Sequence, residues 1–321
     1  MLAAGSALTT QVSSQWGVIF AVGLLSAAGA GAGSFSILIG ATAQRIPAER
    51  RSFAGGVINA GGSMGQFIFA PLNQAVMSAF GWMSAMWTMA ALALTTAPMA
   101  WWLRGTPRKP GVEAVADSGL TLRQQLQIAF RDKSYWCLHA GFFTCGFHIA
   151  FLVTHMPGEV AMCGLSATVA STSLAIIGLT NVAGSLVVGA LGSRMRMKLI
   201  LFWMYASRAA AIVVYMAAPK EPWTFYLFAA VLGATWLATV PPTAGLTAKL
   251  FGPRYLGTLF GLTLLSHQIG GFLGAWLGGV AVVSLGSYEW MWWADAALAL
   301  LAAFVNLPIR EARPAPQLAT A

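Results

Sequence analysis

The sequence predicts an all-α fold, a polytopic bundle of transmembrane helices, and three observations support it. Hydrophobic residues make up 58% of the 321 residues and charged residues only 8%, whereas a typical soluble domain has about 25% charged residues. Apolar stretches of about 20 residues, enough to cross a bilayer as a helix, recur along the chain. The basic residues fall between these stretches and not on one face, so the net charge of +9 does not indicate binding of nucleic acid.

Apolar stretches of spanning length define the expected helices. There are nine of them, at residues 16-43, 53-80, 82-103, 136-163, 166-192, 198-218, 223-251, 257-285 and 288-308. Residues 1-10 are apolar too, but they are too few to span and lack the basic start of a signal peptide. The sequence therefore predicts three plus six complete spans, preceded by a short N-terminal stub.

The connection at residues 104-134 is the one long polar segment, and it is the expected boundary between two bundles. Thr121 and Gln124 have the spacing of a capping box ahead of the amphipathic run LRQQLQIAF, which predicts a short interfacial helix. The expected parts are a truncated N-terminal bundle at 1-103, this central loop, a six-helix bundle at 135-310 and a tail at 311-321.

Lys and Arg collect on the cytoplasmic side of membrane proteins. If the 104-134 connection is cytoplasmic, 16 of the 18 basic residues lie inside, Lys220 lies outside and Arg208 lies within a span. This distribution predicts an integral membrane protein with a cytoplasmic central loop and a cytoplasmic C-terminus.

An internal repeat relates the two bundles. Thr42-Ala43-Gln44, ahead of a proline, an arginine and a Gly-rich span, recurs 205 residues later as Thr247-Ala248-Lys249. By this offset, the helix that starts near residue 136 has its counterpart before residue 1. We therefore expect a protein of six plus six helices whose first half lacks two to three helices.

Two related six-helix halves joined by a basic loop resemble the major facilitator superfamily of secondary transporters. The segment GALGSRMRMK, which contains Gly189, Arg194 and Lys198, is similar to the family's G-x-L-x-D-R-x-G-R-R/K loop, although Ser193 stands where Asp is expected and Arg196 where Gly is expected. Residues 141-160 and 241-261 look like bacterial permeases near the monocarboxylate and oxalate/formate porters.

The resemblance implies a function and a location. It implies a secondary active transporter of a bacterial cytoplasmic (inner) membrane, which moves a small organic anion such as a monocarboxylate by alternating access, coupled to protons or to a counter-anion. It implies no enzyme and no cofactor, and no metal-ligand spacing is found. An efflux permease for another small molecule and a transport-incompetent fragment are the alternatives. By family correspondence, spans 16-43, 136-163 and 223-251 line the central cavity.

Ionisable groups inside a bilayer are costly to bury and usually functional, so they are the first candidates for substrate or proton binding. With about 3.6 residues per turn, His148, His155 and Glu159 share one face of span 136-163. The alternative is that His148 and His155 hydrogen-bond to neighbouring helices and that Glu159 lies in outside water. Pro157-Gly158 is expected to break the outer end of this helix and to act as a gate hinge.

Arg208 lies near the bilayer midplane and needs a partner. It is expected either to bind a substrate carboxylate or to form a structural ion pair with Asp295. His267, in the middle of span 257-285, is a further substrate or proton candidate, with polar packing as its alternative.

Proline and glycine mark two further features of the spans. Pro241-Pro242 is expected to interrupt span 223-251 as a hinge or a simple kink. Gly61 and Gly65, and Gly270, Gly274 and Gly278, recur at the small-xxx-small spacing that lets helices approach closely.

Overall fold

The computed structural model of the chain describes residues 1–43, 46–47, 50–102 and 120–311, and all regular secondary structure in these ranges is helical. The all-α prediction is thus confirmed. The helices are α1 Leu2–Thr9, α2 Gln15–Val18, the π-helix η1 Ile19–Ser26, α3 Ala27–Ala32, α4 Phe35–Ala43, α5 Arg51–Trp102, α6 Leu122–Arg131, α7 Lys133–Met162, α8 Ala167–Leu191, α9 Met197–Ala217, α10 Pro222–Thr235, the 3-10 helix η3 Leu237–Thr239, α11 Val240–Phe251, α12 Leu256–Leu285 and α13 Glu289–Asn306.

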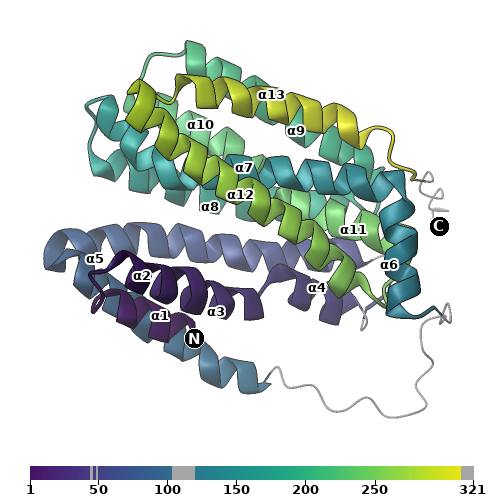
Figure 1. Cartoon of the computed structure of the whole chain (residues 1–321). Coiled ribbons are helices and arrows are strands. Elements are labelled where there is room, and N and C mark those ends of the chain that lie inside the picture. Colours follow the sequence, from purple (N-terminus) through teal and green to yellow (C-terminus); the bar gives the residue numbers. More distant parts are fainter. Residues whose placement is uncertain (44–45, 48–49, 103–119, 312–321) are drawn as a thin grey trace, which may run out of the picture.

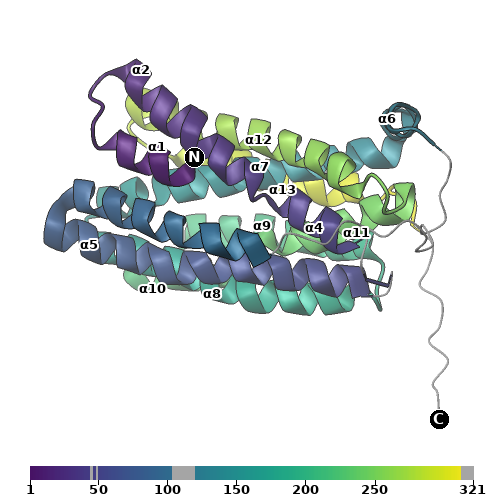
Figure 2. The same ribbon diagram turned by 90° about the horizontal axis from the view of Figure 1, so that it is seen from below.

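The long helices run roughly parallel in two groups, with α1 to α5 below and α7 to α13 above in Figure 1. Helix α5 is two antiparallel arms that meet at Gly81, where φ is 80° and ψ is 170°, and Figure 2 shows the arms side by side. A positive φ is a conformation that glycine adopts without steric cost. This bend separates the two predicted spans 53-80 and 82-103.

Seven segments in the described part of the chain are long and apolar enough to cross a membrane. They are Gln15–Ala43, Arg51–Pro98, Lys133–Met162, Ala167–Leu191, Met197–Ala217, Pro222–Phe251 and Leu256–Leu285. Seven is fewer than the predicted nine because the two arms of α5 count as one segment and α13 is not among the seven. The count of nine is not confirmed, although a helical stretch corresponds to each predicted span.

The span predicted at 16-43 is not one regular helix. It consists of α2, the π-helix η1, α3 and α4, and it is interrupted at Gly33 and Ser34. The predicted stub is the eight-residue helix α1, which packs beside η1 and α5. A β-carbon on Gly29 would lie 2.4 Å from the backbone nitrogen of Leu2, so the glycine-rich sequence allows the stub to approach this closely.

Glycines bring α7 and α12 into backbone contact. A β-carbon on Gly270 would lie 2.0 Å from the carbonyl oxygen of Phe143, and one on Gly274 would lie 2.2 Å from that of Phe147. The small-xxx-small prediction is therefore confirmed on α12. Gly61 and Gly65 do not pack in this way, since a β-carbon on Gly61 would meet nothing within 4 Å.

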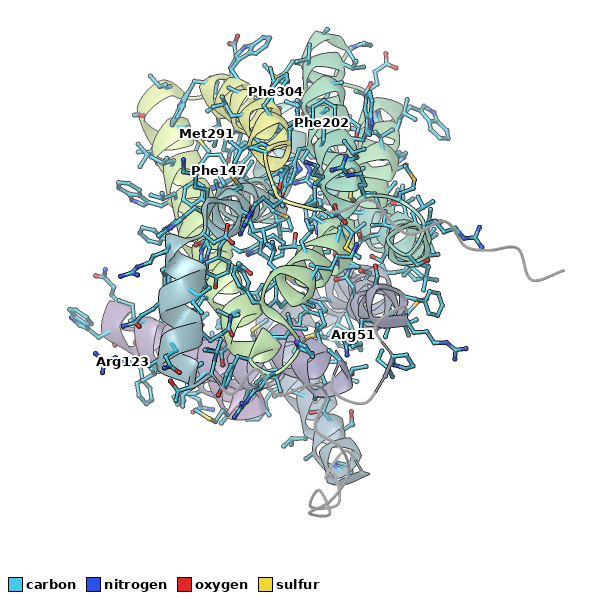
Figure 3. All side chains as sticks on the ribbon, turned by 90° about the vertical axis from the view of Figure 1, so that its right-hand side faces the viewer. Arg51, Arg123, Phe147, Phe202, Met291 and Phe304 are labelled. Carbon is cyan, nitrogen blue, oxygen red and sulfur yellow. The ribbon has the colours of Figure 1, made fainter. Side chains whose placement is uncertain are left out.

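The largest cluster of buried side chains fills the interior of the α7 to α13 group. It includes Phe147 and Phe151 of α7, Trp236 between α10 and η3, and Met291 and Trp292 of α13. Figure 3, viewed from the right-hand side of Figure 1, labels Phe147 and Met291 within this group. A second cluster, which includes Leu138 of α7 and Leu201 of α9, lies in the same group of helices. The polar residues buried among these clusters need partners inside the protein.

Helix α6 starts with the predicted capping box. The backbone N–H of Thr121 donates to Gln124 Oε1 at 2.9 Å, and the Thr121 hydroxyl accepts from the backbone nitrogen of Gln124 at 3.4 Å. The helix lies crosswise at one end of the bundle (Figure 1). Residue 103 of the predicted span 82-103, residues 104–119 of the predicted central loop and residues 312–321 of the predicted tail lie outside the described residues.

Candidate site at the break between α10 and α11

The span Pro222–Phe251 is broken near its middle. Helix α10 ends at Thr235, the backbone of Trp236 has a ψ of −92°, and η3 leads into α11. Pro241 and Pro242 cause the break, because neither has an N–H to donate to the carbonyl four residues earlier and each ring clashes with that carbonyl. The predicted interruption is confirmed, and it falls upstream of the prolines. A role as a hinge stays a prediction.

Arg208 of α9 binds the carbonyl groups that the break leaves free. Its Nη2 donates to the carbonyl oxygens of Thr235 at 2.8 Å and Trp236 at 3.1 Å. The side chain is 1% exposed, and its Nε and Nη1 have no hydrogen-bond partner among the described residues. A buried guanidinium with free donors is thus held at the centre of the bundle.

Asp295 of α13 pairs with His148 of α7 and not with Arg208. The Asp295 carboxylate accepts from Nδ1 of His148, and both side chains are fully buried. The ion pair expected between Arg208 and Asp295 is not formed. The physical reason is that the helix break offers Arg208 two carbonyl oxygens, while α7 places an imidazole beside the carboxylate.

The His148–Asp295 pair lies next to the helix break between α10 and α11. The ring centroids of His148 and Trp236 are 5.6 Å apart in an edge-to-face arrangement, and Arg208 lies within electrostatic range of His148. His148 Nε2 and Asp295 Oδ1 have no hydrogen-bond partner among the described residues. With a neutral imidazole, the Arg208 and Asp295 charges cancel. A proton on His148 would give this buried site a net positive charge.

A second polar network joins α5 to α8 and to the same break. Asn59 Nδ2 donates to Ser185 Oγ at 2.6 Å and to the carbonyl oxygen of Leu237 at 3.0 Å. The backbone N–H of Leu237 donates to Asn181 Oδ1 at 3.0 Å, and Asn181 Nδ2 donates to Ser63 Oγ. The first half of the chain is therefore hydrogen-bonded to the broken helix of the second half.

Sequence reasoning missed this network because it followed ionisable residues. The signal was available, since Asn59 and Asn181 are amides in the middle of apolar spans, where amides commonly bond between helices. Cys145 makes a further contact at the break, where its Sγ lies 3.4 Å from Thr239 Oγ1. No sequence pattern indicates this contact, because it depends on the path of the chain around the break.

The structure does not bring the three predicted polar residues of α7 into one cluster. His148 binds α13, whereas His155 Nε2 donates to the carbonyl oxygen of Ala275 on α12 at 2.7 Å. Glu159 Oε1 accepts from the hydroxyl of Tyr215 on α9 at 2.9 Å. Each side chain therefore links α7 to a different neighbour. This is the alternative role given above for His148 and His155, whereas Glu159 bonds to a helix and not to water alone.

The expected break at Pro157-Gly158 was wrong. Helix α7 continues through both residues to Met162. Proline removes only one hydrogen bond here, to the carbonyl of Val153, and Gly158 packs against Tyr288, whose hydroxyl would lie 2.8 Å from an added β-carbon. Packing therefore keeps the last turns helical.

His267 is half-buried on α12. Its Nδ1 lies 3.1 Å from Gln268 Oε1, and its ring centroid is 5.6 Å from that of Phe142. Its Nε2 has no hydrogen-bond partner among the described residues. His267 lies within interaction range of Cys145, and it takes no part in the His148–Asp295 pair.

The end of α8 and the loop that follows it contact α5 and the segment after α13. Gly189 packs against α5, with an added β-carbon 3.0 Å from the carbonyl oxygen of Ser52, and Arg194 is exposed. Lys198 Nζ donates to the carbonyl oxygens of Leu307 at 2.7 Å and Ile309 at 2.9 Å. Ser193 stands where the family loop has an aspartate, but another carboxylate reaches this segment. It belongs to Glu311, which accepts from the backbone N–H of Lys198 at 2.9 Å.

Comparisons with known proteins agree with this architecture. The chain matches the Major Facilitator Superfamily over residues 1–275 and 162–321. It is 21% identical, over 256 residues, to the uncharacterized MFS-type transporter YcxA of Bacillus subtilis (strain 168), a match that covers 77% of this chain and 62% of YcxA. The chain thus spans less than two thirds of that relative's length.

A solved structure shares the fold. The fucose:proton symporter FucP of E. coli superimposes with a TM-score of 0.68 and 15% sequence identity, over 97% of this chain and 82% of FucP. At this identity, the likeness is one of fold alone. Taken with the spanning helices, the family match shows that the chain belongs to the major facilitator superfamily and is an integral membrane protein.

Proposed function

We propose that the protein is a proton-coupled secondary transporter that moves a small organic anion, such as a monocarboxylate, by alternating access across a bacterial inner membrane. The observation that carries the proposal is the buried His148–Asp295 pair beside Arg208 at the break between α10 and α11. Imidazole exchanges protons near neutral pH more readily than any other side chain. Intramembrane ionisable residues of this kind mark proton relays and substrate paths.

The guanidinium supports an anionic substrate. Its Nε and Nη1 are donors without partners among the described residues, and guanidinium binds carboxylate through two parallel hydrogen bonds. Arg208 is 1% exposed in this conformation, so an anion reaches it only after α10 and α11 separate from α9. Opening at the helix break would provide that access.

Protons are the proposed coupling ion for two reasons. Protonation of His148 changes the net charge of a buried site that contains Arg208 and Asp295, so proton occupancy changes how strongly the site attracts an anion. In addition, the fold matches that of a fucose:proton symporter. Loss of the proton would weaken the attraction and favour release of the anion on the other side.

The test uses the purified chain in proteoliposomes with labelled lactate, formate or oxalate. We expect uptake of one of these anions that rises when the interior is made alkaline. His148→Gln is expected to lose this gradient dependence and to retain exchange of internal for external substrate. The matched control is His155→Gln on the same helix, which should keep the gradient dependence. Equal dependence on the gradient in wild type and His148→Gln would exclude the proposed coupling site.

A further inference from the structure

A basic groove lies where α6, the start of α7 and the segment after α13 meet. Its volume is about 680 Å³, and its walls include Ile128, Arg131, Lys133, Pro308 and Arg310. Three basic side chains face one acidic side chain, Asp132, so the groove has a net charge of +2. These residues come from two separate segments of the chain, 128–137 and 308–310, and are not one basic run.

The groove is built by hydrogen bonds that fix its floor. Asp132 Oδ1 accepts from the backbone N–H of Ser134 at 2.8 Å at the start of α7, and the other oxygen of the same carboxylate pairs with Arg310. The backbone N–H of Arg310 donates to Ser134 Oγ at 3.1 Å. Arg131 and Lys133, on either side of Asp132, are exposed. They are therefore positioned to bind an anion above this floor.

The surroundings of the groove are typical of a membrane interface. Helix α6 lies across the end of the bundle, crosswise to the spanning helices (Figure 1). Ile128 and Phe130 of α6 are 46% and 41% exposed, and Trp136 is 54% exposed, with its indole Nε1 donating to the carbonyl oxygen of Phe130 at 2.9 Å. Amphipathic helices and tryptophan side chains with this exposure lie at the boundary between head groups and acyl chains.

We propose that this groove binds the phosphate head group of an anionic phospholipid. Arg131, Lys133 and Arg310 would donate to the phosphate oxygens, and the exposed apolar side chains beside them would contact the acyl chains. The face is the one that the distribution of Lys and Arg predicts to be cytoplasmic, where anionic lipids attract basic residues near the membrane surface. The apolar rim favours a lipid over a soluble phosphate, which would leave Ile128 and Phe130 in water.

Native mass spectrometry of the purified full chain, titrated with phosphatidylglycerol or phosphatidylcholine, tests the proposal. The variant Arg131→Gln/Lys133→Gln removes two charges and keeps the Asp132–Arg310 pair. Since each basic residue at a membrane surface contributes about 1 kcal/mol, or about fivefold in affinity, we expect affinity for phosphatidylglycerol to fall about 30-fold. Affinity for phosphatidylcholine should not change.

Two controls separate a specific site from diffuse charge and from misfolding. Arg123→Gln/Arg194→Gln removes two exposed basic residues outside the groove, one of which, Arg123, is labelled at the far side of α6 in Figure 3. Arg131→Lys/Lys133→Arg keeps both charges. Both controls are expected to retain affinity for phosphatidylglycerol within about threefold.

Three results would overturn the proposal. The first is an equal loss of affinity in the Arg123→Gln/Arg194→Gln control, which would indicate diffuse charge. The second is full affinity in Arg131→Gln/Lys133→Gln. The third is displacement of phosphatidylglycerol by inorganic phosphate, which would indicate a site for a soluble anion.

Discussion

At the scale of single residues, the position of Arg208 shows how a buried charge finds partners. A guanidinium removed from water must replace its hydrogen bonds, and a broken helix offers carbonyl oxygens without N–H partners of their own. Thr235 and Trp236 supply them. This leaves Asp295 to pair with His148, the residue whose proton occupancy changes the charge of the site.

Replacing Arg208 with glutamine should destabilise the fold. The change leaves the buried carbonyls of Thr235 and Trp236 without their donor, so we expect the free energy of unfolding to fall by about 3 kcal/mol. Denaturant unfolding in detergent, followed by circular dichroism, measures this. Arg194→Gln in the exposed loop is the control and should change the free energy by less than about 0.5 kcal/mol. Equal effects of the two changes would contradict the structural role.

The coupling between His148 and Asp295 can be measured with a double-mutant cycle. Because the two side chains are in direct contact, the double variant Asp295→Asn/His148→Gln should lose less free energy of unfolding than the sum of the two single losses. We expect the difference to be at least about 1 kcal/mol. The same cycle with His155→Gln in place of His148→Gln should be additive, because His155 binds α12 instead. An additive result for His148 and Asp295 would show that the pair contributes no interaction free energy.

At the scale of elements, glycine determines which helices pack and proline determines where one breaks. The crossing of α7 and α12 requires Gly270 and Gly274, since each faces a carbonyl oxygen at a distance that no β-carbon allows. The break before α11 follows from Pro241 and Pro242. A single proline at position 157 does not break α7, so proline content alone does not locate a hinge.

Two matched glycine substitutions should change stability in opposite directions. Gly274→Ala inserts a methyl group against the Phe147 carbonyl, and overpacking of this kind costs about 1–3 kcal/mol. Gly61→Ala meets open space in a helix and should stabilise the fold by up to about 1 kcal/mol, because alanine is the better helix former. The melting temperature in detergent reports both. A stabilising Gly274→Ala would show that the helices are farther apart than described.

At the scale of the whole molecule, the two halves touch through α5 and α8 and through α4 and α12. A β-carbon on Gly56 would lie 2.5 Å from the carbonyl oxygen of Ser185, and one on Gly40 would lie 2.9 Å from the α-carbon of Gly257. The second contact lies at the end of the bundle that the basic residues predict to be cytoplasmic. In the proposed transport cycle this end opens, so we expect the contact between Gly40 and Gly257 to separate.

A reversible cross-link tests that movement. Oxidation of Ser36→Cys/Gly261→Cys, whose β-carbons would lie 3.9 Å apart across the same contact between α4 and α12, should lock the two helices and reduce uptake by at least about tenfold, because only one of the two states remains populated. A reducing agent should restore uptake. Gly261→Cys alone, treated in the same way, is the control. Full uptake by the oxidised double variant, with the disulfide verified by mass spectrometry, would show that this contact does not separate.

Local features of the fold could be predicted from the sequence, and contacts between helices could not. Apolar length located the spans, Thr121 and Gln124 predicted the start of α6, and Pro241 and Pro242 predicted the break. Which buried side chains pair with each other depends on the rotation and depth of each helix, and the sequence does not give these. For this reason the sequence suggested Asp295 as a partner of Arg208. The expected absence of the first helices and the monocarboxylate branch stay predictions.

The most direct test of the central claim is to measure proton movement driven by substrate. Proteoliposomes that contain a trapped pH dye are given an inward gradient of the transported anion, without any initial pH difference. For the wild type and His155→Gln, we predict that the interior acidifies as substrate enters. For His148→Gln, we predict that substrate enters with no acidification. Substrate entry without acidification in the wild type, or with full acidification in His148→Gln, would contradict the account.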